Sequence, residues 1–101
     1  MALEITNLRF LDQLRRGDRP PGAEVSLLKI KGTEIQQSLT ELMMQAAGPF
    51  VQAFRPVDTD PAFDRFTATL APRYCNVRKA TIYAGSNEIQ RNIISKLALG
   101  L

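Results

Sequence analysis

The sequence predicts an all-α protein, built as an up-and-down bundle of three to four helices. Apolar residues recur at steps of three and four along most of the chain, which is the period of a helix. Stretches rich in proline and glycine separate these segments, and no stretch alternates apolar and polar residues as a half-buried strand does. With 101 residues, we expect a single helical-bundle domain over residues 1–101.

The first helix is expected over residues 2–16. Leu8, Leu11 and Leu14 are spaced by three residues, with polar residues between them. The prolines and glycines of residues 17–22 cannot continue a helix, so this stretch predicts a tight loop.

The second helix carries the clearest signal in the chain. Small or apolar residues step by three and four to form an apolar seam: Val25, Leu28, Gly32, Ile35, Leu39, Leu42 and Ala46. This seam predicts a bundle helix that buries it, and it also offers a contact surface for another chain. Gly32 costs about 1 kcal/mol of helix stability relative to alanine, so we expect another backbone to approach closely there.

The segment after Gly48-Pro49 is less regular. Residues 50–54 could continue the helix after a kink, residues 55–61 predict a loop, and Asp60-Pro61 is a typical helix start. The apolar residues of the following helix fall into two sets, Phe63, Phe66 and Leu70, then Tyr74, Val77 and Ile82. Pro72 between them either begins a new helix or bends this one.

The last helix is expected to begin within the stretch Y-A-G-S-N-E-I-Q-R-N-I-I, which runs from Tyr83 to Ile94. Ser86 and Asn87 are both typical N-cap residues, and Asn87 with Gln90 three positions later resembles a capping box. A free helix start also presents unpaired N–H groups that suit a phosphate or another anion. Ordinary capping and a ligand-binding role are both consistent with this stretch.

The composition excludes several functional classes. The chain is 45% hydrophobic, 23% charged and carries a net charge of +3, but its basic residues are scattered, so no nucleic-acid partner is expected. No apolar run approaches the ~18 residues of a membrane span, so no membrane insertion is expected. The chain has no histidine and one cysteine, Cys75, which we expect to pack as a small apolar residue. No metal site is therefore predicted. The single cysteine predicts a reducing, cytoplasmic location.

Two stretches resemble the acyl-CoA dehydrogenase family. The C-terminal I-Y-A-G-S-N-E-I-Q-R-N-I-I, followed by L-A-L-G-L, is similar to the family's terminal signature. L-L-K-I-K-G-T-E-I-Q-Q-S-L-T-E-L, from Leu27 to Leu42, resembles its Lys-x-x-x-Ser/Thr-Glu helix. The order and separation of the two stretches also fit, and the resemblance extends over essentially the whole chain. Family members have several hundred residues, so the chain resembles only the latter part of their C-terminal helical bundle.

The resemblance implies a function and a set of site residues. Family members are FAD-dependent oxidoreductases of fatty acid metabolism that introduce a double bond between the α and β carbons of an acyl-CoA substrate. Ser86, Asn87, Glu88 and Gln90 match positions that approach the flavin, and Gly85 and Tyr83 match positions beside the thioester and the acyl pocket. The contacts would be a partial set, so we expect the isolated chain to be inactive and not to retain FAD.

One position departs from the family pattern. Many members place the proton-abstracting glutamate directly before the glycine of this motif, and here that residue is Ala84, so no catalytic residue is assigned within the chain. Either the base lies on an earlier helix, as in some branches of the family, or the protein is not a dehydrogenase of this type. The alternative is a non-catalytic helical interaction module, or a subunit that completes a shared site with other chains of a homo- or hetero-oligomer.

Overall fold

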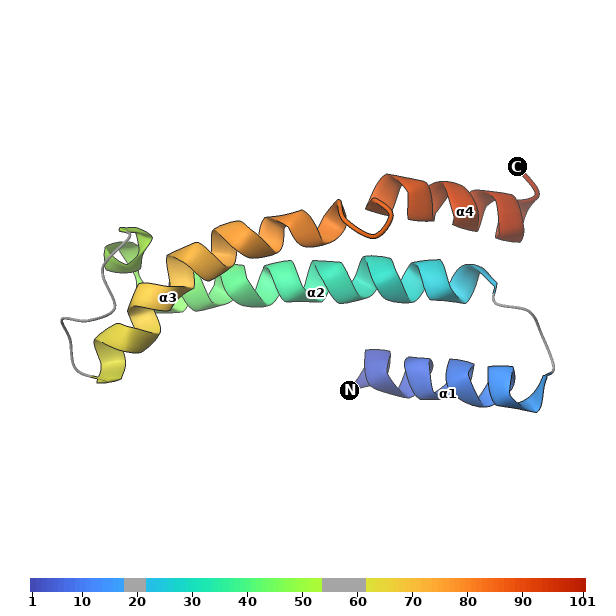
Figure 1. Ribbon diagram of the computed structural model, residues 1–101, viewed down its shortest axis with the longest axis horizontal. Coiled ribbons are helices and arrows are strands. Elements are labelled where there is room, and N and C mark those ends of the chain that lie inside the picture. The colour runs from blue at the N-terminus through green and yellow to red at the C-terminus, as the bar shows by residue number, and fades with distance from the viewer. Residues whose placement is uncertain (18–21, 54–61) are drawn as a thin grey trace. The chain divides into compact units, whose positions relative to one another are not determined.

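All regular elements in the described part of the chain are helical, which confirms the all-α prediction. The computed structural model describes residues 1–17, 22–53 and 62–101 (Figure 1). In chain order the elements are α1 (Ala2–Arg16), α2 (Ala23–Ala47), the 3₁₀ turn η1 (Pro49–Gln52), α3 (Ala62–Val77), the 3₁₀ turn η3 (Arg78–Thr81) and α4 (Asn87–Leu99).

Most predicted helix ends agree with the structure. α1 ends at Gly17, whose φ of 70° is left-handed and whose N–H bonds the carbonyl of Leu14, as is typical of glycine C-caps. After Gly48 the chain forms the short η1 turn instead of continuing α2 past a kink. Pro72 lies inside α3 and does not begin a new helix. The expected loops at residues 18–21 and 55–61, the Asp60 cap and the apolar role of Phe63 fall outside the residues or side chains that the structure describes.

The chain divides into two compact units. Unit 1 comprises residues 1–34 and 81–101, which contain α1, the first part of α2 and α4. Within it, α1 runs antiparallel to α2 (Figure 1). Leu3 lies close to Gly32, and Asn7 lies close to Leu28. Unit 2 comprises residues 35–80, which contain the remainder of α2 together with η1 and α3.

The buried face of α2 is not the predicted one. Ser26, Ile30 and Thr40 are the buried residues of this helix, whereas Leu39 and Leu42 of the apolar seam remain 54% and 58% exposed. The hydroxyl of Thr40 donates to the carbonyl of Gln37 at 2.8 Å, so its polar group is satisfied within the helix. Periodicity identified the apolar stripe correctly, but the residues that the rest of the described chain covers are Ile30 and the hydroxyl-bearing Ser26 and Thr40.

The expectation for Gly32 was also wrong. A Cβ at this position would meet only the side chain of Leu3, at 3.8 Å, which is an ordinary van der Waals contact rather than a close backbone approach. α1 itself has no buried residue, and Leu8, Leu11 and Leu14 are all exposed. The structured chain therefore presents apolar side chains from α1 and from α2 to its surroundings.

Candidate functional site

The turn before α4 is exposed and has an unusual backbone. Ala84 has φ of 53° and Gly85 has φ of 86°, so two successive residues occupy the left-handed region. Glycine adopts this conformation without cost, but alanine there is strained. Tyr83, Ala84 and Gly85 are all exposed. The turn therefore presents backbone, with little side-chain cover, directly in front of a helix N-terminus.

Ser86 is the N-cap of α4. Its side-chain oxygen accepts a hydrogen bond from the N–H of Ile89 at 3.3 Å, and its carbonyl accepts one from the N–H of Gln90 at 3.0 Å. Asn87 is the first residue of the helix and not its N-cap, so the expected capping box that pairs Asn87 with Gln90 was wrong. The N–H groups of the first turn that precede Ile89 have no partner within the helix, as at any helix start.

Asn87 is the one residue of α4 that is buried, with 4% of its surface exposed. Its Oδ1 accepts a hydrogen bond from Nζ of Lys29 at 2.8 Å, and its Nδ2 donates to Oγ1 of Thr33 at 3.1 Å. The Thr33 hydroxyl in turn donates to the carbonyl of Ile30 at 2.9 Å. The side chain of Asn87 is thus committed to α2, and sequence reasoning missed this contact because it joins positions 58 residues apart.

Glu88 and Gln90 have different surroundings. The Glu88 carboxylate is exposed and lies 3.8 Å from Arg91, which is also 4.0 Å from Glu34 of α2. Pairs as exposed as these contribute little to stability. Gln90 is half-buried and its amide folds back over Gly85, where an added Cβ would lie 2.8 Å from Nε2. The structure therefore gathers all the predicted site residues from Tyr83 to Gln90 on one turn and the first turn of one helix.

The chemistry available at this turn is binding rather than catalysis. Ala84 has no proton-accepting group, and the remaining carboxylate, Glu88, is solvated and paired with Arg91. The helix dipole places partial positive charge at the start of α4, and the Lys29 ammonium adds charge of the same sign next to Asn87. Such a surface suits anionic or polar ligand atoms. Among the described residues, no cluster of acidic residues or cysteine could hold a metal ion.

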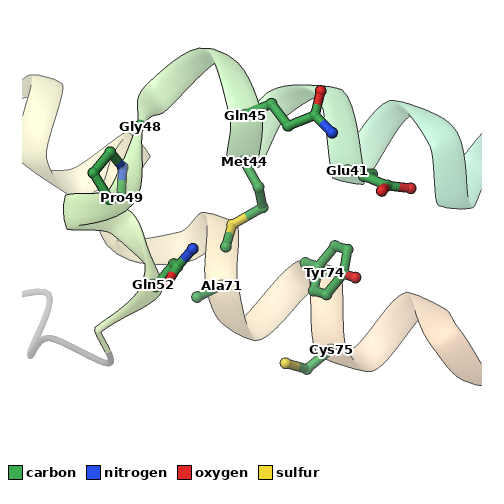
Figure 2. A pocket seen from close by; sticks show the side chains of 9 residues that line it. All are labelled: Glu41, Met44, Gln45, Gly48, Pro49, Gln52, Ala71, Tyr74 and Cys75. Carbon is green, nitrogen blue, oxygen red and sulfur yellow. The ribbon is translucent and has the colours of Figure 1, made fainter.

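A hollow lies in unit 2, where α2, η1 and α3 meet (Figure 2). Its volume is about 580 Å³, and it is lined by the apolar groups of Met44, Pro49, Ala71 and Tyr74, together with Glu41, Gln45, Gly48, Gln52 and Cys75. No hydrogen bond joins Glu41, Tyr74 and Cys75 in the described structure, so the hollow holds no nucleophile–base pair. Cys75 was expected to be packed, but its thiol is exposed, because its position on α3 faces this opening.

Comparison with protein families gave one clear match. A model described as acyl-CoA dehydrogenase, C-terminal domain, covers residues 1–99, which is nearly the whole chain. Neither the curated proteins nor the solved structures gave a significant match. Within the described residues, none of the helices combines the length and the apolar character needed to cross a membrane.

Proposed function

The chain belongs to the acyl-CoA dehydrogenase family, as part of its C-terminal domain, and from this premise we propose that it forms one wall of the flavin and substrate site of an FAD-dependent acyl-CoA dehydrogenase. The observation that carries the proposal is the turn Tyr83–Ser86 in front of α4, of which Tyr83, Ala84 and Gly85 are exposed. It combines accessible backbone with the positive end of a helix.

The residues at this turn fit part of a flavin dinucleotide. Gly85 is exposed and has no side chain, so a flat group or a phosphate could approach its backbone by displacing the Gln90 amide that lies over it, and the first N–H groups of α4 supply donors of the right sign. The side chains of Ser86, Glu88 and Gln90 would also contact the cofactor. Asn87 would contribute its main-chain N–H, because both polar atoms of its side chain are already bonded to α2.

The acyl-CoA substrate would lie beside Gly85, with the exposed ring of Tyr83 bordering the acyl chain. A bound flavin supplies the hydride acceptor for α,β-dehydrogenation of the thioester. The chain itself supplies orientation and a polar wall, but no base, because Ala84 occupies the position where many family members carry a glutamate. We therefore propose that the proton-abstracting carboxylate comes from another part of the site.

The chain is too small a part of such a site to act alone. A few hydrogen bonds from a single turn do not offset the entropy lost when a large cofactor is immobilised. We propose that the isolated chain is inactive and does not retain FAD, that it forms one domain of a cytoplasmic enzyme of fatty acid metabolism, and that further chains of an oligomer pack against it. The exposed leucines of α1 and α2 support the last point.

The exposed apolar seam also supports a second candidate function. A non-catalytic interaction module would use the same surface to complete a site with a partner chain, without itself contacting flavin. The two functions differ in what they require of Gly85. A ligand-binding role requires Gly85 to stay accessible in the assembly, whereas an interaction module does not. They also differ in their dependence on the cofactor.

A flavin titration tests the proposal. The purified chain is mixed with FAD, and the visible spectrum is recorded before and after acyl-CoA is added. The same measurement is made after coexpression with the coding sequence next to it in the genome. We expect no tight binding by the chain alone, and flavin that acyl-CoA bleaches in the complex. Tight, substrate-reducible flavin on the isolated chain would contradict the proposed incompleteness, and a flavin-free complex would favour the interaction module.

A further inference from the structure

The start of α4 is held by a chain of hydrogen bonds rather than by apolar packing. The ammonium of Lys29 can only donate, so the oxygen of the Asn87 amide must face it, at 2.8 Å. The amide nitrogen is then directed to Oγ1 of Thr33, at 3.1 Å, and the Thr33 hydroxyl donates a hydrogen bond to the carbonyl of Ile30, at 2.9 Å. Every step pairs one donor with one acceptor, an arrangement in which successive bonds strengthen one another.

The geometry of α2 makes this arrangement specific. Lys29 and Thr33 lie one helical turn apart, so they project from the same side of α2 and receive a single side chain between them. Asn87 is the one buried residue of α4, while Ile89, Ile93 and Leu97 of the same helix are exposed. The orientation of the first turn of α4 relative to α2 in unit 1 is therefore specified by this amide, because no buried apolar side chain of α4 specifies it.

The turn in front of α4 needs such support. Ala84 and Gly85 both have positive φ, and the alanine there is held against its intrinsic preference. Strained turns of this kind persist only where the surrounding structure determines them. The bonds to Lys29 and Thr33 act on the residue that immediately follows Ser86, and so on the point where the strained turn joins the helix.

We infer that Lys29 and Thr33 are positioning residues, which act through Asn87 to hold the turn Ala84–Ser86 and the first turn of α4 in a preformed arrangement. The claim that this arrangement serves a flavin rests on the proposed function. The claim that Lys29 and Thr33 create it does not, and the two are tested separately.

The positioning role is tested by amide hydrogen exchange and NMR on the full 101-residue chain. Lys29→Met keeps the aliphatic length and removes the donor, and Thr33→Val keeps the shape and removes the hydroxyl. A hydrogen bond to a charged group contributes enough for a change of about ten-fold in an equilibrium. We therefore expect roughly ten-fold faster exchange at the amides of Ile89 and Gln90, together with a shift of the Asn87 side-chain NH₂ resonances.

Matched variants separate positioning from general stability. Lys31→Met removes an exposed lysine that bonds Glu34, at 2.9 Å, and because the exposed Glu34–Arg91 pair at 4.0 Å contributes little, it should leave the exchange at α4 unchanged. Asn87→Asp still offers an oxygen to Lys29 and should retain protection, whereas Lys29→Met combined with Asn87→Asp buries an unpaired carboxylate and should lose more than either change alone. Exchange at Leu70 of unit 2 reports whether a variant has unfolded as a whole.

Two results would overturn the inference. One is exchange at Ile89 and Gln90 in Lys29→Met within two-fold of the unmodified chain, and the other is an equal effect of Lys31→Met. The unmodified chain gives a further check, because a freely exchanging Asn87 NH₂ group would contradict the bonds themselves. Failure of the complex to take up FAD would instead reject the proposed function, and the exchange data would still decide the role of Lys29 and Thr33.

Discussion

Gln37 and Arg78 bond each other in both directions. The side-chain amide of Gln37 donates to the main-chain carbonyl of Arg78 at 3.1 Å, and the guanidinium of Arg78 donates to the main-chain carbonyl of Gln37 at 2.8 Å. The guanidinium also reaches the hydroxyl of Thr40 at 3.2 Å and lies 4.3 Å from the centre of the Tyr74 ring. Because each side chain binds the backbone of the other residue, this pair sets the register of α2 against the start of η3, directly after α3, within unit 2.

Replacing Arg78 with methionine should destabilise the chain by about 2 kcal/mol, since hydrogen bonds from a charged donor typically contribute 1.5–3 kcal/mol. Urea or thermal denaturation measures the loss. Arg73→Met, at an exposed arginine of α3, is the control, and it should change stability by less than about 0.5 kcal/mol. Equal losses of stability in the two variants would show that the hydrogen bonds of Arg78 contribute no more than an exposed arginine side chain does.

Gly32→Ala should stabilise the chain. The position lies inside α2, where alanine is preferred over glycine by roughly 0.5–1 kcal/mol, and the added methyl group would meet only Leu3 at 3.8 Å. Thermal denaturation should show a higher midpoint. A lower midpoint would mean that α1 packs more tightly against α2 than the structure indicates.

Gly85→Ala should have the opposite effect. The backbone there has φ of 86°, and the new Cβ would lie 2.8 Å from Nε2 of Gln90, so the strain and the displaced amide should together cost about 1–3 kcal/mol. Ala84→Gly is the matched control in the same turn, since it relieves strain at a φ of 53° and should leave stability unchanged or slightly higher. Comparable losses in both would contradict the backbone argument.

Removal of the N-cap hydroxyl in Ser86→Ala should cost about 1 kcal/mol, the usual effect of losing such a cap. Hydrogen exchange at the Ile89 amide, the donor to this hydroxyl, should accelerate. Ser86→Asp should preserve protection because a carboxylate also caps a helix. Ser95→Ala, within α4, controls for the loss of a hydroxyl elsewhere in that helix, and an equal effect there would argue against capping by Ser86.

The double variant Leu39→Ser and Leu42→Ser tests the apolar seam as a contact surface. Both side chains are more than half exposed, so the fold should be little affected, whereas association of the chain should weaken. Sedimentation velocity over a wide range of concentrations measures the change, with Ser38→Ala as the control on an exposed position of α2. A chain that is monomeric at all concentrations before mutation would weigh against this surface as an oligomer contact.

The sequence predicted the helices well because the signals that begin and end a helix are local. Gly17 and Ser86 act within a few residues of their position, and the structure has them as the caps of α1 and α4. The direction of burial was not predictable in the same way. The period of Leu39 and Leu42 shows that they share a face, but not whether the described chain covers that face, and here the covered residues include Ser26 and Thr40.

The same distinction between local and long-range signals applies to the candidate site. The turn at Ala84 and Gly85 could be found from its residue types, since small residues before a helix start are a local pattern. The bonds from Lys29 and Thr33 to Asn87 could not, because polar residues one turn apart on a helix usually face solvent. Their partner lies on a different helix, and pairing across that distance in sequence depends on the tertiary fold.

The exposed leucines of α1 and α2 have a thermodynamic consequence. Heat-capacity changes and denaturant dependence both scale with the apolar area that unfolding brings into water. Since Leu8, Leu11, Leu39 and Leu42 already contact solvent in the folded chain, its unfolding should show a small heat-capacity increment and a shallow denaturant slope for its length. Burial of the same side chains on assembly should appear instead as a large negative heat capacity of association.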